Sequence, residues 1–255
     1  NANGKKDLYM KKITVMLLPL VIAALCSFNM KIEGDNSPVV KENRKSGTFQ
    51  NVSADANCDV IIIQGDKSSI IVEGNKKSVG NTVTSIENGT LKIAHANNNN
   101  IIFGNVKVTV TTPEVNSVSL YGTGDIHIPG KLVSENLRIH LCGTGDIEAN
   151  ALACINLDAI LDGTGDMKIN NVSCSKSTIT LNGTGDISTK AINVEESFLT
   201  LTGTGDMDVK FVDCGSASCS LSGTGDIELE GNLKSLKKDD SGIGSIETKK
   251  LHVGM

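Results

Sequence analysis

Aromatic residues are scarce in this chain of 255 residues, which has no Trp, two Tyr and five Phe. Apolar residues still make up 39% of the sequence, so a core must be built mainly from Val, Ile, Leu and Ala. Together with 26 Gly, this composition favours thin repeated layers over one bulky interior. The shortage of aromatics also argues against a protein that stacks sugar rings on aromatic side chains.

Basic residues are too few to form a broad positive surface. The 24 Lys and Arg are outnumbered by 29 Asp and Glu, which gives a formal net charge of -5 and a pI near 5.4. Nucleic acid partners need clustered positive charge, so no nucleic acid partner is expected.

The first 26 residues have the features of a secretory signal peptide preceded by a few upstream residues. Met10-Lys11-Lys12 is a basic start, and residues 13–25 are apolar apart from Thr14 and Pro19. The run is shorter than the roughly 20 residues of a membrane span, so no transmembrane segment is expected in the mature chain. We therefore expect export to the periplasm, the outer-membrane surface or the medium. A lipid anchor on Cys26 is the less favoured alternative, because Leu25 is bulky where lipoprotein processing prefers a small residue.

A tetrapeptide, Gly-Thr-Gly-Asp, recurs at nearly constant spacing. It occurs six times, in one step of 21 residues and four of 20, beginning at Gly122, Gly143, Gly163, Gly183, Gly203 and Gly223. Apolar residues at i and i+2 flank each copy on both sides, which is the period of strands. A unit of 20 residues cannot bury its own face, whereas successive units stacked as coils can. The sequence therefore predicts an all-β parallel β-helix, with a third apolar side at Leu152, Val172, Ile192 and Val212.

The chain divides into four parts on this basis. After residues 1–26, the polar residues 27–45 are expected to be a flexible tether. Residues 46–117 lack the strict period but hold β-rich stretches and an Asn88-Gly89 hairpin signal, and we expect irregular coils that cover the N-terminal end of the stack. Residues 118–255 are the regular repeats, ending in a degraded coil at Gly242-Ile243-Gly244-Ser245 whose charged neighbours discourage edge-to-edge pairing.

The order of motifs resembles that of a known bacterial family. The stretches "GTFQNVSADANCDVIIIQGDKSSIIVEGN", "NGTLKIAHA" and "VKVTVTTPEVNSVSLYGTGDI" follow the pattern of the family described as putative auto-transporter adhesin, head GIN domain. The resemblance covers about residues 46–255. It implies a right-handed parallel β-helix that is exported to the Gram-negative envelope, and it brings no catalytic residues with it.

The Asp of each tetrapeptide is the first candidate for a site. Stacked carboxylates about 4.8 Å apart would repel one another by roughly 1 kcal/mol per pair in water, so something must offset the repulsion. We expect each Asp to accept hydrogen bonds from nearby backbone N–H groups and cap its turn. A calcium ladder is the alternative, and no other cofactor is expected. The residues concerned are Asp125, Asp146, Asp166, Asp186, Asp206 and Asp226.

Six cysteines remain after residue 26. Three of them, Cys154, Cys174 and Cys214, share one repeat position with Val194, which predicts free thiols in the core. Cys154 and Cys174 lie one coil apart, and a disulfide between them is the alternative. No Cys pair has the spacing of a zinc site.

These observations favour a noncatalytic exported β-helix, an adhesin or surface scaffold whose partner is an envelope protein, a host protein or a glycan. The alternative is a β-helix that binds or degrades polysaccharide. Arg138 is the single Arg of the coils, and the regular Asp row distinguishes no acid from a base. His127 and His140 lie on adjacent coils, either as a solvated pair or as a site. The glycines are not followed by the Lys of a phosphate loop, so nucleotide binding is not expected.

Overall fold

The structure is a computed structural model that describes residues 31–96 and 100–254. The predicted signal peptide and Cys26 lie outside the described residues. The chain divides into two units, and in the smaller one β1 (Lys31–Gly34) pairs in parallel with β8 (Asn100–Phe103). The larger unit holds all the other strands and the β-helix. Within the described residues, no helix has both the length and the apolar character needed to cross a membrane.

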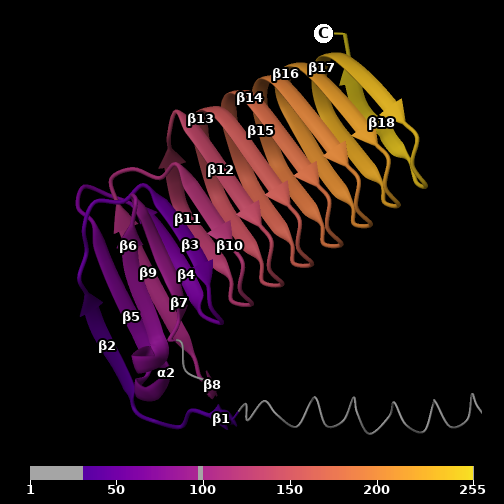
Figure 1. Cartoon of the computed structure of the whole chain (residues 1–255). Coiled ribbons are helices and arrows are strands. Elements are labelled where there is room, and N and C mark those ends of the chain that lie inside the picture. Colours follow the sequence, from indigo (N-terminus) through magenta and orange to yellow (C-terminus); the bar gives the residue numbers. More distant parts are fainter. Residues whose placement is uncertain (1–30, 97–99, 255) are drawn as a thin grey trace, which may run out of the picture. The chain divides into compact units, whose positions relative to one another are not determined.

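The regular coils of the larger unit are stacked parallel strands (Figure 1). In each pair of neighbours, residues about 20 apart in the sequence are register partners, as in the row Leu161, Leu181, Leu201 and Leu221. This arrangement confirms the predicted parallel β-helix. The strands are β10 (Ser117–Leu120), β11 (Ile126–Val133), β12 (Asn136–Leu141), β13 (Ile147–Leu161), β14 (Met167–Leu181), β15 (Ile187–Leu201), β16 (Met207–Leu221), β17 (Ile227–Asp240) and β18 (Ile246–Val253).

Each coil buries alternate residues, because successive side chains of a strand point to opposite faces. In β14 the buried residues Met167, Ile169, Val172, Ile179 and Leu181 stack on the corresponding residues of β13 and β15. The resulting core is a continuous column of aliphatic side chains along the axis.

One residue predicted for the third apolar side does not face the core. Leu152, Val172 and Ile192 are buried as expected, but Val212 is 49% exposed. The pairing of β15 with β16 shifts by one residue at this point, so Phe211 becomes the partner of Ile192 and is buried instead. The prediction for Val212 was therefore wrong, because a bulge interrupts the period.

The Gly-Thr-Gly-Asp turns connect one coil to the next. They stack so closely that their glycine positions leave no room for a side chain. A Cβ added to Gly185 would overlap the carbonyl oxygen of Gly165 in the preceding coil. The backbone of each turn is also hydrogen-bonded to the previous one, as in the bond from the Thr184 N–H to the Gly163 carbonyl (3.0 Å). Glycine is required here for close approach of two backbones.

The N-terminal strands continue the stack and then change direction. β3 (Asn51–Asp55) and β4 (Asp59–Gln64) pair in parallel with β10 and β11, and β7 (Thr90–His95) and β9 (Val106–Thr112) follow them. Beyond these, β5 (Ser69–Asn75) is antiparallel to β9, and β6 (Thr82–Glu87) is antiparallel to β7 through the expected turn at Asn88-Gly89. At the N-terminal end of the β-helix, the last strand on both of these faces is therefore antiparallel to its neighbour.

Two further elements lie at the same end. β2 (Val39–Arg44) pairs with β5, although the sequence predicted a flexible tether over residues 27–45. The short helix α2 (Lys76–Asn81) is tied to the start of the larger unit by Asp35, whose carboxylate accepts the N–H and the hydroxyl of Ser78, both at 2.7 Å. Burial alone would raise the pKa of Asp35, but hydrogen bonds from Ser37 and Ser78 outweigh it and hold the pKa well below its usual range.

Candidate functional site

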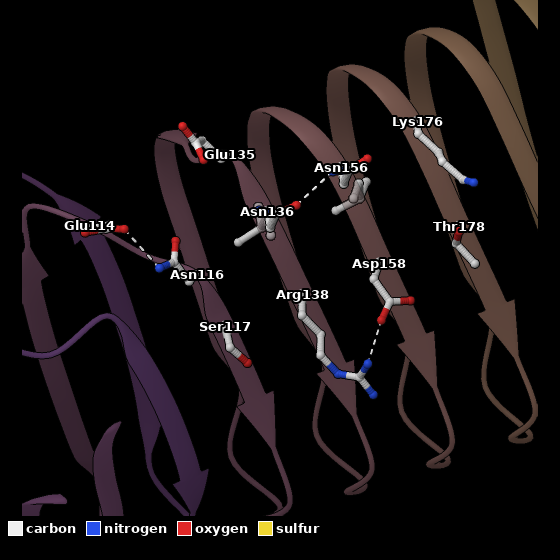
Figure 2. Close-up of a pocket in the computed structure, with 12 residues that line it drawn as sticks. Glu114, Asn116, Ser117, Glu135, Asn136, Arg138, Asn156, Asp158, Lys176 and Thr178 are labelled. Carbon is white, nitrogen blue, oxygen red and sulfur yellow. Dashed lines mark hydrogen bonds and ion pairs between the residues drawn. The ribbon is translucent and has the colours of Figure 1, made fainter. Parts of the chain in front are cut away.

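An open groove lies on the outer face formed by β10, β12, β13 and β14 (Figure 2). It has a volume of about 850 Å³, and we call it the Arg138 groove. Most of the residues that line it are polar, but more of the exposed lining is apolar than polar, and two core leucines contribute to it. The lining residues are Glu114, Asn116, Ser117, Glu135, Asn136, Leu137, Arg138, Asn156, Leu157, Asp158, Lys176 and Thr178.

The register of the coils places the polar groups of the groove next to one another. Arg138 and Asp158 are register partners, and Arg138 Nη1 lies 2.6 Å from Asp158 Oδ2. Two residues earlier on each strand, Asn156 Nδ2 donates to Asn136 Oδ1 at 2.8 Å. Figure 2 shows these pairs running across neighbouring strands. The groove thus presents charged and amide groups in rows along the axis of the β-helix.

Two of the groove's carboxylates are already engaged. Glu114 accepts hydrogen bonds from Gln50 (2.8 Å) and Asn116 (3.0 Å), and Asp158 is paired with Arg138. All of these groups lie on an open surface rather than in a water-excluded cavity. Glu135 is a third carboxylate in the lining.

Lys176 forms the far end of the groove. Its Nζ lies 4.7 Å from the centre of the Phe198 ring in the next coil and 3.8 Å from Glu196. The cation is thereby held above an outward-facing aromatic ring, a contact that favours a fixed orientation. Arg138 and Lys176 are the two cationic side chains that line the groove.

The two candidate histidines are not brought together. His127 lies on β11 and is 3.7 Å from Glu148, whereas His140 lies on β12 and its Nε2 is 2.8 Å from Asp162 Oδ2. β11 pairs with the first half of β13 and β12 with its second half, so the two histidines belong to different faces. The site hypothesis for this pair therefore has no geometric support.

His140 belongs instead to a row of outward side chains that the sequence analysis did not single out. Its ring packs edge-on against Tyr121, with centroids 5.9 Å apart. Asp162 also accepts a hydrogen bond from Asn182 at 2.8 Å, and that bond, followed by the contact with His140, lowers the pKa of the Asp162 carboxyl. The available signal was the shared repeat position of Tyr121, Asp162 and Asn182, directly before the glycine of each turn.

The six aspartates of the turns form a one-way ladder of hydrogen bonds. In each coil, Oδ1 of the Asp accepts the backbone N–H of the Asp in the next coil, at 2.8–3.0 Å. The ladder begins at Asp59, which accepts the Asp125 N–H at 3.3 Å, and ends at Ser245, which donates its N–H to Asp226 at 2.7 Å. The acceptors are carboxylates, as predicted, but each donor belongs to the following coil.

The calcium alternative stays a prediction. In the part of the chain that the structure describes, no group of three or more His, Cys, Asp or Glu side chains is arranged to hold a metal ion. One oxygen of each ladder Asp is committed to a backbone N–H, and this bond itself offsets part of the repulsion between stacked carboxylates.

The six described cysteines are all free thiols in the structure. Cys58, Cys214 and Cys219 are buried, and burial raises the pKa of Cys58 and of Cys219 to about 12. Cys154 and Cys174 are only half-buried, and Cys142 is exposed. Of the three cysteines predicted to lie in the core, Cys214 is therefore buried, whereas Cys154 and Cys174 are partly exposed to solvent.

Fold and groove together define a β-helix with an open groove on one outer face. The family model described as "Putative auto-transporter adhesin, head GIN domain" matches residues 48–213 and 177–255, and the chain belongs to this family. The resemblance inferred from the sequence motifs is thereby confirmed. No curated protein matches the sequence.

Solved structures with the same fold come from Bacteroides and Parabacteroides species. A putative adhesin from Bacteroides fragilis NCTC 9343 is 22% identical, with a TM-score of 0.72 over 84% of this chain and 98% of that one. A putative adhesin from Parabacteroides merdae ATCC 43184 is 16% identical, with a TM-score of 0.71 over 85% and 100%. A putative lipid binding protein from Parabacteroides distasonis ATCC 8503 is 18% identical, with a TM-score of 0.69 over 85% and 100%. At these identities the similarity establishes the fold.

Proposed function

We propose that this protein is an exported, noncatalytic β-helix of the cell envelope that binds a polar partner through the Arg138 groove and serves as an adhesin or surface scaffold. The observation that carries the proposal is the row of polar groups from successive coils, centred on the Arg138–Asp158 pair (2.6 Å). The family's adhesin description supports a binding role.

A glycan is the partner whose chemistry fits the groove best. Asn136 and Asn156 offer amide donors and acceptors, while Arg138 and Lys176 offer charged donors suited to hydroxyl or carboxylate groups. An extended chain lying along the axis would meet different polar groups on successive coils, because Ser117, Arg138, Asp158 and Thr178 are register partners. The groove lining contains no aromatic residue, so stacking on sugar rings is not part of this proposal.

The test is a glycan array probed with the full chain, followed by titration of each hit with wild-type and Arg138→Ala protein. We expect Arg138→Ala to weaken binding by about 10-fold, the effect of losing one good charged hydrogen bond. Lys190→Ala, on the first half of β15 and outside the groove, is the matched control and should bind normally. Equal binding by wild type and Arg138→Ala would exclude the groove as the site.

Catalysis is tested on the same hits by chromatography of the glycan after long incubation. Intact glycan is the expected result, whereas shortened chains would favour the alternative of a polysaccharide-degrading β-helix. Acidic polysaccharides belong in this assay, because many β-helix enzymes act on them.

Export is tested by fractionating a Gram-negative host that expresses the chain with a C-terminal tag. We expect loss of residues 1–26 and recovery outside the cytoplasm. Retention of the full-length chain in the cytoplasm would contradict this part of the proposal. Labelling with a radioactive fatty acid decides separately whether Cys26 carries a lipid.

A further inference from the structure

Two cysteines of neighbouring coils lie side by side at the surface of the β-helix, in a hollow that shares no lining residue with the Arg138 groove. Cys154 of β13 and Cys174 of β14 are register partners in a parallel pair. Adjacent strands lie about 4.8 Å apart, which is within the Cα separation of about 4.4–6.8 Å that a disulfide spans. In the next coil the same position is occupied by Val194, which separates this cysteine pair from Cys214, the third cysteine of the repeat position.

The environment of this pair differs from that of a core residue. Both side chains pack against the hydrophobic core but are half-buried, and they line a surface hollow to which polar residues such as Ser173 and Asn193 and the buried Cys214 also contribute. The hollow has a volume of about 640 Å³, so a small molecule can reach the sulfur atoms. Cysteines in such partly exposed positions react, whereas fully buried ones are inert.

The two thiols also interact directly. The interaction between the two thiols lowers the pKa of Cys154 and raises that of Cys174. The thiolate is the nucleophile of thiol–disulfide exchange, which makes Cys154 the first to react. Cys174 is then already in contact with the sulfur that it must attack.

We propose that Cys154 and Cys174 form a redox-active dithiol that a small disulfide oxidises to an intramolecular disulfide between β13 and β14. The Cys154 thiolate attacks one sulfur of the reagent, for which oxidised glutathione is the probe, and one glutathione thiolate leaves. The Cys174 thiolate then attacks the Cys154 sulfur and releases the second glutathione. The two thiol protons end on the two glutathione molecules, so one disulfide is reduced for each one formed.

The chain carries its own control for this reaction. Cys142 is exposed but has Tyr121 and Asp162 at its position in the neighbouring coils, so it can form a mixed disulfide and cannot close one with a neighbour. Cys58 and Cys219 are buried and do not line the hollow, so they should remain unmodified in the folded protein, whereas Cys214 lines the hollow and is not a control. The inference is independent of the proposed function, because it needs no partner in the groove.

The experiment treats the folded full chain with oxidised glutathione, blocks the remaining thiols with N-ethylmaleimide, and maps the peptides by mass spectrometry. Cleavage after Glu148, Lys168 and Lys176 separates Cys142 from Cys154 and yields peptides 149–168 and 169–176. We expect these two peptides to be joined by a disulfide and Cys142 to carry one glutathione. Cys142→Ser should keep the link.

A second measurement compares thermal midpoints. The link closes a loop of about 20 residues, so oxidised wild-type protein should melt on the order of 5 °C higher than reduced protein, and Cys154→Ser and Cys174→Ser should each abolish the difference. Peptide mapping of the wild type needs no variant, so poor folding of either variant leaves the test intact. Recovery of Cys154 and Cys174 as separate alkylated or glutathionylated peptides would overturn the proposal.

Discussion

The regular coils and the N-terminal strands of the larger unit share one core but are built by different rules. From β13 to β17, each coil contacts its neighbours through the same backbone and side-chain rows, about 20 residues apart. At the N-terminal end, antiparallel β2, β5 and β6 replace the repeat. In the regular coils the same backbone hydrogen bonds and side-chain rows hold every coil to its neighbour. The end of the stack has no such repeat and is held by specific contacts such as those of Asp35.

The largest expected change in the free energy of unfolding comes from replacing a glycine of the stacked turns, compared with a glycine of α2. Gly185→Ala should destabilise the protein by about 3 kcal/mol or more, because the new Cβ would overlap the backbone of Gly165 in the preceding coil. Gly80→Ala in α2 meets no atom within 4 Å and should be neutral or stabilise by up to about 1 kcal/mol. Urea unfolding monitored by circular dichroism measures both. Equal effects would mean that stacking of the turns does not limit stability.

The aspartate ladder is tested by Asp146, whose Oδ1 accepts the Asp166 N–H at 2.8 Å. Asp146→Ala leaves that half-buried N–H without its acceptor and should cost about 1–2 kcal/mol. Asp146→Asn keeps an oxygen acceptor and removes one charge from the row, so it should be neutral or stabilising without calcium. If calcium raises the melting temperature of the wild type but not of Asp146→Asn, the ladder binds metal. No calcium effect on either would argue for the hydrogen-bonding role alone.

A buried hydroxyl pair inside the regular coils gives the next effect. Ser177 Oγ donates to Ser197 Oγ at 2.8 Å, and both residues are fully buried in otherwise apolar rows. Either single change to Ala should destabilise by about 1 kcal/mol, because the remaining hydroxyl loses its partner. The double variant should recover part of that loss. Additive losses in a double-mutant cycle would show that the two hydroxyls do not depend on each other.

The smallest expected effect concerns the N-terminal end and depends on pH. Hydrogen bonds hold the pKa of Asp35 below its usual range, so its contribution to stability is present above about pH 4, the usual unfolded value, and is lost as the pH falls through the folded pKa. Asp35→Asn should therefore lower the melting temperature at pH 7, and the gap to wild type should narrow below pH 4. A gap that is constant from pH 7 to pH 2 would contradict this account.

The sequence predicted the regular coils well because every coil repeats the same physical solution. It failed at Val212 because Phe211 and Val212 are both apolar, and a period of 20 cannot tell which of two adjacent residues faces inward once a bulge intervenes. β2 was missed because its residues are mostly polar and it lies at an edge of the sheet.

The Arg138 groove was harder to predict than the fold. Arg138 was noticed as a single residue, but its partner Asp158 becomes apparent only when residues 20 apart are compared as neighbours on the outer face. Glu114 and Asn116 precede the regular repeat, so the spacing of 20 residues does not predict where they lie. The groove combines residues of the repeat with residues that precede it, so the spacing of the repeat alone could not predict it.

The hydrogen bonds of the aspartate ladder all run in one direction, from the backbone N–H of one coil to the carboxylate of the coil before it. Every internal coil therefore presents a carboxylate acceptor to the coil after it and a backbone N–H donor to the coil before it. Excising residues 163–182 would bring Asp186 next to Asp146 with the same pairing restored. The length of the β-helix is in this sense an adjustable quantity, which gene duplication or an engineer can change by whole coils without redesigning either end.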